Sequence, residues 1–349
     1  MKILKYLFLL LLIAIIGGAI YIATLPGEFN VTRSKTINAP AQVIFDEVND
    51  MKNWNDWNAW KEADPSIVVT LGEQTKGVGG NYTWTDKHGS GTMKTVASDS
   101  PKSIEQEMQF DEFPASKVSW SFEPAEQGTR VVWGIKGEQN FMLKTFSIFM
   151  GSMEDNIGPF YERGLEMLDS VVVNSMNAYD VKVNGISEYG GGYYLYRSTA
   201  AAPNNLSNAM AQQFGSVMGF MQQNDIKQTG MPFTIYHEMK LEGGNVIMSN
   251  GIPVKEKIVI TGEDNDGVLC DYLPATPAVK VTLKGNYSNL PEAWTTAQEY
   301  VSKMNLTPST TIKPFEIYTT DPGNYPNPAD WVTEIYVPIE NPLSTNASN

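Results

Sequence analysis

The residue types that most often bind metals or carry out catalysis are scarce in this chain of 349 residues. Its single cysteine, Cys270, excludes an internal disulfide and a cysteine-based metal cluster. His88 and His237 are the only histidines, too few for a histidine-rich metal site. We therefore expect no metal and no other cofactor. The available chemistry is that of carboxylates and of aromatic side chains, which include 8 Trp and 16 Tyr.

One carboxylate occurs in a strand-like segment near the C-terminus, "WVTEIYVPI". Alternation along a strand puts Val332, Glu334 and Tyr336 on the same face. A carboxylate among apolar groups costs free energy unless a cation, hydrogen bonds or a proton compensates it. Glu334 is therefore a candidate functional residue. The alternative is an exposed glutamate on a terminal strand.

A repeated phrase indicates how such a strand is positioned. "PFTIYHEM" begins at Pro232 and "PFEIYTTD" begins at Pro314. Before each phrase the pattern changes from strand-like alternation to helical spacing, so each copy is predicted to run strand, helix, strand, strand. Two such units can join into one sheet with both helices on one face. We expect a concave opposite face and a pocket on the pseudo-twofold axis.

Residues 180–341 resemble the GyrI-like small-molecule-binding domain, which is also the effector-binding part of some AraC-type and MerR-type regulators. The matching segments are "KGNYSNLPEAW" at 284–294, "PFEIYTTDP" at 314–322 and "DWVTEIYVPI" at 330–339. Lys284 departs from the pattern, because many relatives carry a histidine there.

This resemblance implies that Glu334 is the central carboxylate of an aromatic pocket. The aromatic residues that would line its walls are Tyr336, Tyr318, Tyr236, Tyr287 and Trp294, with core packing as the alternative for Trp294. Phe233 and Phe315 are expected on the opposite face from the tyrosines, packed against the helices.

Two functions follow from this pocket. An ionised Glu334 would pair with a hydrophobic, cationic small molecule stacked on aromatic rings. Alternatively, Glu334 would act as a general acid or base in a hydrolase of small electrophiles, since some GyrI-like relatives hydrolyse strained rings. Non-covalent binding is our main prediction, and a purely structural module is a third possibility.

Residues 29–175 resemble the START/polyketide-cyclase (SRPBCC) superfamily through "VTRSKTINAPAQVIFDEVNDMKNWNDWNAW". The resemblance implies a helix-grip domain with an apolar cavity between a curved sheet and a long C-terminal helix. It implies no particular reaction, because members range from lipid carriers to enzymes. Trp54, Trp57 and Trp60 would line the mouth of this cavity or form aromatic core.

The long helix of this region is predicted from about 143 to 173. Gly158-Pro159 would mark a kink or restart. Its apolar stripe would include Phe146, Phe149, Met150 and Met153.

The N-terminal residues 1–28 are predicted to be a transmembrane anchor. No charged residue occurs from 6 to 25, and about 20 helical residues span roughly 30 Å of hydrocarbon. Lys2 and Lys5 favour a cytoplasmic N-terminus, with the soluble domains on the periplasmic side of a bacterial membrane. A cleaved signal peptide is the alternative.

The formal net charge of −14 gives nucleic-acid binding no electrostatic support. No helix-turn-helix precedes the effector-type domain, so we expect that the protein is not itself a transcription factor. The segment "GEDNDG" at 262–267 is interpreted as an acidic turn rather than a calcium loop. In all, the sequence predicts an α+β protein with an anchor helix, a helix-grip domain and a duplicated GyrI-like domain.

Overall fold

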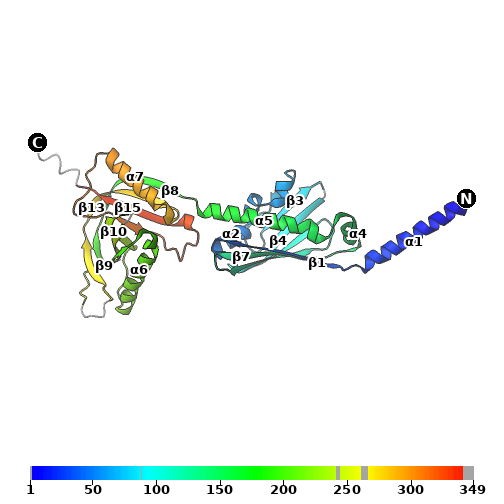
Figure 1. The fold of residues 1–349 in the computed structure, drawn as a ribbon, viewed down its shortest axis with the longest axis horizontal. Helices are drawn as coiled ribbons and strands as arrows, with labels where there is room; N and C mark the ends of the chain where they lie inside the picture. Colours follow the sequence, from blue (N-terminus) through cyan, green and yellow to red (C-terminus); the bar gives the residue numbers. More distant parts are fainter. Residues whose placement is uncertain (1, 88, 241–243, 261–265, 341–349) are drawn as a thin grey trace. The chain divides into compact units, whose positions relative to one another are not determined.

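The computed structural model describes residues 2–87, 89–240, 244–260 and 266–340 (Figure 1). His88, most of the acidic turn at 262–267 and the C-terminal tail from 341 lie outside the described residues. The chain divides into two compact units, Met1–Ser175 and Met176–Asn349, and each is considered by itself.

The first unit begins with one long apolar helix, α1 (Lys2–Thr24). Its segment Ile3–Thr24 has 22 residues, a mean hydropathy of 2.6 and no burial against the rest of the chain. Pro26 and Gly27 follow, and both residue types oppose continuation of a helix. A membrane anchor and a signal sequence both have this length and composition.

In the described part of the first unit, seven strands form one antiparallel sheet, ordered β1-β7-β6-β5-β4-β3-β2. The strands are β1 (Glu28–Ile37), β2 (Val68–Leu71), β3 (Asn81–Asp86), β4 (Gly89–Asp99), β5 (Ser103–Phe110), β6 (Ser116–Pro124) and β7 (Thr129–Glu138). Between β1 and β2 the chain forms α2 (Ala41–Asn49), η1 (Asn53–Asp56) and α3 (Ala59–Ala63). The apolar residues that alternate along β6 and β7 are buried.

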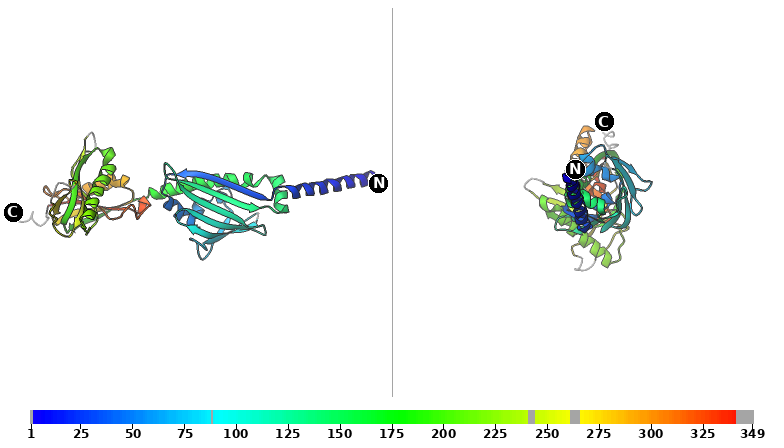
Figure 2. Two further views of the ribbon diagram at one scale, coloured as in Figure 1. Left: turned by 90° about the horizontal axis from the view of Figure 1, so that it is seen from below. Right: turned by 90° about the vertical axis from the view of Figure 1, so that its right-hand side faces the viewer.

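The long helix α5 (Met153–Met176) runs along this sheet (Figure 2). It turns Tyr161, Leu165, Leu168 and Val172 inward, all buried. Gly164 lies so close to the sheet that an added Cβ would sit 2.8 Å from the Trp133 ring. This close approach of helix and sheet is the helix-grip arrangement that the sequence predicted.

The prediction of one helical stretch from 143 to 173, with a kink or restart at Gly158-Pro159, placed the break at the wrong residues. The chain forms two helices, α4 (Phe141–Met150) and α5, separated at Gly151, whose φ of 94° favours glycine. The Ser152 side chain then caps α5 with Asp155. Pro159 lies inside α5, so Gly158-Pro159 is no restart. Gly158 is needed for another reason, because the Arg33 guanidinium lies where a Cβ would be.

In the described part of the second unit, eight strands form one antiparallel sheet, ordered β12-β9-β11-β10-β14-β15-β13-β8. The strands are β8 (Asp180–Tyr189), β9 (Gly192–Ala201), β10 (Phe233–Met239), β11 (Val246–Val254), β12 (Leu269–Leu273), β13 (Thr276–Lys284), β14 (Phe315–Tyr318) and β15 (Val332–Pro338). The helices are η2 (Pro203–Asn205), α6 (Leu206–Gln223), η3 (Tyr287–Asn289), α7 (Leu290–Lys303) and η4 (Pro328–Asp330). The predicted order is present twice, as β9-α6-β10-β11 and as β13-α7-β14-β15.

The two copies meet where the repeated phrases pair. Strands β10 and β14 are antiparallel, with Thr234 opposite Glu316. The join is symmetric, because Tyr236 N donates to Pro314 O and Tyr318 N donates to Pro232 O, each at 3.0 Å. The repeat is therefore a structural duplication with its pseudo-twofold axis at the centre of the sheet.

Helices α6 and α7 pack on the same face of this sheet. Trp294, Ala297 and Val301 of α7 share one apolar cluster with Ala209 of α6 and with inward residues of β11, β13 and β15. Tyr236 belongs to that cluster, whereas Phe233 and Phe315 belong to a cluster on the opposite face. The expectation that the two phenylalanines pack against the helices was wrong, because the tyrosine face is the one that the helices cover.

Candidate ligand-binding sites

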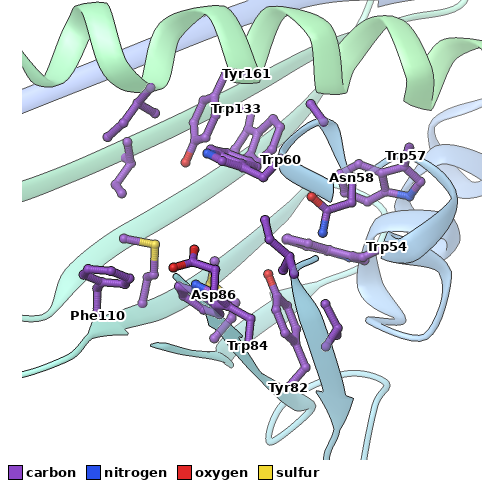
Figure 3. A pocket seen from close by; sticks show the side chains of 17 residues that line it. Trp54, Trp57, Asn58, Trp60, Tyr82, Trp84, Asp86, Phe110, Trp133 and Tyr161 are labelled. Carbon is purple, nitrogen blue, oxygen red and sulfur yellow. The ribbon is translucent and has the colours of Figure 1, made fainter. Parts of the chain in front are cut away.

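The first unit contains a cavity of about 330 Å³ between α5 and the sheet (Figure 3). The residues that line it are Trp54, Trp57, Asn58, Ala59, Trp60, Ile67, Val69, Tyr82, Trp84, Asp86, Met93, Met108, Phe110, Trp133, Ile135, Ile157 and Tyr161. Eight of these are aromatic. This volume lies within the range of small-molecule sites, and the composition suits an apolar guest with flat rings.

Stacked rings make one wall of the cavity rigid. Trp133 lies between Tyr161, with ring centroids 3.7 Å apart and nearly parallel, and Trp120, at 4.4 Å. On the side of α3, Trp60 stacks on Phe160 of α5 at 5.1 Å. Burial raises the pKa of the Tyr161 hydroxyl, so this ring stays neutral. The wall is therefore preformed and uncharged.

Few polar groups line this cavity. Figure 3 shows the Asp86 carboxylate pointing from β3 toward the space below Trp133 and Tyr161. Asn58 also lines it, and its side-chain oxygen accepts a hydrogen bond from Lys61 N at 3.0 Å. Trp133 Nε1 is buried without a hydrogen-bond partner among the described residues. Such sparse polar groups orient an apolar ligand rather than supply its binding free energy.

The second unit contains a buried carboxylate, Glu316 of β14, which is 1% exposed. Three side chains donate hydrogen bonds to it. Trp294 Nε1 donates to Oε1 at 2.6 Å, and the hydroxyls of Tyr236 and Tyr318 donate to Oε2 at 2.9 and 2.8 Å. Burial raises the pKa of Glu316, and these three donors act in the opposite direction.

The surroundings of Glu316 come from both copies of the repeat and from both helices. Tyr236 packs edge-on against Trp294 of α7, and Tyr318 packs edge-on against Phe214 of α6. Tyr287 lies edge-on to Tyr318, with ring centroids 5.8 Å apart. Burial raises the pKa of the Tyr287 hydroxyl to about 12. An acid thus lies at the pseudo-twofold axis inside an aromatic shell.

Glu334 lies on the opposite face of the sheet. The register explains this, because Glu334 pairs with Ile317 whereas Glu316 pairs with Ile335. Its carboxylate forms an ion pair with Lys280 Nζ at 2.8 Å, and both side chains are about one-fifth exposed, 22% and 21%. Burial alone would lower the pKa of Lys280, but hydrogen bonds to Glu334 and Tyr336 raise it overall.

Aromatic rings surround this ion pair on the sheet face that α6 and α7 do not cover, called the open face below. Tyr336 donates its hydroxyl to Glu334 at 2.9 Å and stacks on Phe315, with ring centroids 5.0 Å apart. Tyr189 packs edge-on against both of these rings. Lys280 Nζ lies 5.5 Å from the centroid of Tyr336, within cation–π range.

Residues 28–173 match the family model described as polyketide cyclase / dehydrase and lipid transport. The first unit contains an SRPBCC domain. No curated protein matches the chain.

Solved structures similar to this chain include the C-terminal domain of EcmrR, at 21% identity and a TM-score of 0.37, covering 47% of this chain and 98% of that one. The EcmrR–DNA complex matches at 18% identity and a TM-score of 0.40, covering 59% and 87%. A protein from Chromobacterium violaceum matches at 12% identity and a TM-score of 0.32, covering 41% and 96%. At such low scores no property of those proteins transfers to this one.

The structure divides the six predicted site residues of the second unit between two places. Tyr236, Tyr318 and Trp294 surround Glu316, with Tyr287 beside them, whereas Glu334 and Tyr336 lie on the open face. Glu316 was not among the site residues predicted from the sequence. A signal for it was present, since the five-residue match Pro-Phe-x-Ile-Tyr differs only at x, which is Thr234 in the first copy and Glu316 in the second.

In the SRPBCC domain, Trp54, Trp57 and Trp60 all line the cavity. Both sequence interpretations hold in part, because Trp54 and Trp57 are also buried in the aromatic core. No sequence pattern indicated Asp86 or Trp133 as lining residues. They come from strands whose order in the sheet decides which side chains meet beneath α5.

Proposed function

We propose that this chain is a membrane-anchored protein that binds a hydrophobic small molecule in the cavity of its SRPBCC domain. The observation that carries the proposal is the cavity of about 330 Å³ with eight aromatic lining residues. A guest with fused or linked rings would stack on the Trp133–Tyr161 wall and displace poorly held water, which favours binding.

A cavity-filling substitution tests this proposal. Met108→Trp adds bulk to a lining position, whereas Val96→Trp adds the same side chain at an exposed position of β4 outside the cavity. The protein is embedded in lipid nanodiscs and titrated with N-phenyl-1-naphthylamine, with tryptophan-sensitised emission as the readout. We expect a saturable component for the wild type and for Val96→Trp, and its loss for Met108→Trp. Equal saturable binding by all three folded proteins would exclude this cavity as the site.

For the second unit we propose that an aromatic cation binds on the open face at Glu334 and Tyr336. Lys280 already places a cation over the Tyr336 ring, which supports the idea that a ligand ammonium or phosphonium group takes the same place. In a thermal-shift titration with tetraphenylphosphonium, Glu334→Gln should abolish the stabilisation that the wild type shows, and Glu316→Gln should retain it. The reverse order would assign the ligand to Glu316 instead.

Binding is favoured over hydrolysis as the function of the second unit. Glu316 accepts three hydrogen bonds and is closed to solvent, so a substrate cannot reach it to exchange a proton. Glu334 is engaged by Lys280 and Tyr336.

The anchor belongs to the proposal as well. Helix α1 would cross the bilayer through residues 6–25, with both units on the periplasmic side. Alkaline carbonate extraction of membranes tests the anchor, because an intact span stays in the pellet. Recovery of the full-length chain in the supernatant would refute it.

A further inference from the structure

Helix α4 exposes an unusual number of apolar side chains for a ten-residue segment. None of its residues is buried. The large apolar side chains that α4 exposes are Phe141, Met142, Phe146, Ile148, Phe149 and Met150. Phe149, at 78% exposure, is the most exposed of them. Exposed apolar patches of this kind usually mark a contact surface.

Four of the six exposed apolar side chains lie on one side of α4, whereas Phe141 and Ile148 lie away from that stripe. Met142, Phe146, Phe149 and Met150 have the spacing i, i+4, i+7, i+8, which is one face of a helix. The half-buried positions, including Lys144 and Ser147, face inward. The helix is therefore amphipathic, with its apolar side unpartnered in this structure.

The inward side of α4 is fastened to the end of α1. Lys144 Nζ donates to Leu25 O at 2.7 Å, and Gln139 N, just before α4, donates to Gly27 O at 2.5 Å. Gln139 Nε2 also donates to Ser147 Oγ at 2.8 Å. Figure 1 shows α4 beside the end of α1 from which β1 continues. These bonds hold α4 at the level where the apolar N-terminal helix ends.

We propose that α4 is a second membrane-contact element, lying in the interfacial layer of the bilayer that α1 crosses. This inference rests on the anchor part of the proposed function. The 22 residues of Ile3–Thr24 span about 33 Å at 1.5 Å per residue, close to the hydrocarbon thickness of roughly 30 Å. Leu25 and Gly27 would then emerge at the lipid headgroups. Lys144 of α4 donates to Leu25 O, and Gln139, just before α4, donates to Gly27 O.

A bilayer suits this surface better than a second copy of the chain does. The apolar stripe continues a surface that is itself membrane-seeking, and its phenylalanines and methionines are side chains that interfacial helices bury to about 5–10 Å depth. The single charged residue of the helix, Lys144, points inward to Leu25 O and leaves the stripe uncharged. The SRPBCC domain thus contacts the membrane through both α1 and α4, which restricts its orientation more than α1 alone would.

Depth-dependent quenching tests the proposal in the full-length chain. The background is Cys270→Ser, and single labelling sites are made with Phe149→Cys on α4, Ile13→Cys in α1 and Val96→Cys on β4. Each protein is labelled with bimane and reconstituted in vesicles of phosphatidylethanolamine and phosphatidylglycerol that carry nitroxide lipids. We expect the label at 149 to be quenched by shallow nitroxides, the label at 13 by deep ones, and the label at 96 by neither.

The label at position 13 tests the α1 anchor independently of the proposed interfacial position of α4. Quenching at 13 with none at 149 would overturn the interfacial helix while the anchor stands. No quenching at 13 would refute the anchor and the inference with it. Energy transfer between chains labelled at 149 that persists on dilution with lipid would assign the stripe to a second copy instead. Positions 149 and 96 are exposed, so labelling either should not unfold the protein, and circular dichroism checks this.

Discussion

Thr234 and Glu316 occupy the same position in the two copies of one sequence repeat, and they lie directly opposite each other across the central pair of strands. Tyr236 donates to Glu316, and the equivalent tyrosine, Tyr318, lies 3.1 Å from Thr234 as well as 2.8 Å from Glu316. The duplication therefore supplies two tyrosines to one carboxylate. Within Pro-Phe-x-Ile-Tyr the two copies differ only at this position, where the second copy carries a buried carboxyl group.

The first prediction concerns the pH dependence of the second unit. Burial raises the pKa of Glu316 above its ordinary value of 4.5, so the folded state holds the proton more tightly than the unfolded state does. The resulting stabilisation is complete below the unfolded-state pKa and is lost as pH rises through the folded-state pKa. Glu316→Gln, which cannot ionise, should remove this loss.

Hydrogen-exchange mass spectrometry on peptides from β10 and β14, corrected for intrinsic rates between pH 4 and 8, measures the effect. Wild-type protection should fall with rising pH relative to Glu316→Gln. The control, Glu334→Gln, changes a carboxylate on the other face and should keep the wild-type trend. A wild type that gains protection with pH relative to Glu316→Gln would show that the three donors outweigh burial.

The second prediction concerns those donors. Tyr236→Phe removes one hydrogen bond from a carboxylate that is closed to water, and such a loss costs about 1–3 kcal/mol of unfolding free energy. It should also raise the pKa of Glu316 further, because the tyrosine bond lowers it. Urea unfolding at neutral pH measures the cost. Tyr325→Phe, at a side chain that is 47% exposed, should change stability little, and an equal loss in both variants would contradict the special role of Tyr236.

The third prediction concerns the ion pair on the open face. Lys280 and Glu334 are one-fifth exposed, so their coupling should be about 1 kcal/mol, near the upper end for surface pairs. A double-mutant cycle with Lys280→Met and Glu334→Gln measures it by urea unfolding. The coupling should shrink in 0.5 M salt, since part of the pair is solvated. A coupling near zero would mean that Tyr336 alone holds Glu334 in place.

Sequence patterns predicted the order of helices and strands in the second unit correctly. They did not predict which face of its sheet the helices cover. The repeat of Pro-Phe-x-Ile-Tyr correctly predicted a duplicated strand-helix-strand-strand unit. Alternation assigns Glu316 and Glu334 to faces of their own strands only. Which of those faces the helices cover depends on the pairing of β14 with β15, which no local pattern encodes.

The helix break illustrates a different limit. Pro159 is the stronger sequence signal, yet α5 begins six residues before it and continues past it, so the proline marks neither end of the helix. Gly151 and the Ser152 cap set the boundary between α4 and α5. The sequence pattern hides this boundary, because the apolar stripe continues across it. The stripe made α4 and α5 look like one helix, although Phe146, Phe149 and Met150 of α4 are exposed.

The fourth prediction contrasts two glycines in helices. In a helix interior alanine is favoured over glycine by about 1 kcal/mol, so Gly219→Ala in α6, which has nothing within 4 Å of the new Cβ, should stabilise the second unit. Gly164→Ala should do the opposite in α5. Its Cβ would lie 2.8 Å from the Trp133 ring, and that ring cannot retreat because it is stacked between Tyr161 and Trp120.

The displaced Trp133 ring would also move the cavity wall, so Gly164→Ala should weaken binding of N-phenyl-1-naphthylamine in addition to lowering the melting temperature of the SRPBCC domain. Calorimetry and the nanodisc titration measure the two effects on the same samples. Gly219→Ala should leave probe binding unchanged. If Gly164→Ala were as stable as the wild type and bound the probe equally well, the close packing of α5 on Trp133 would not be what shapes the cavity.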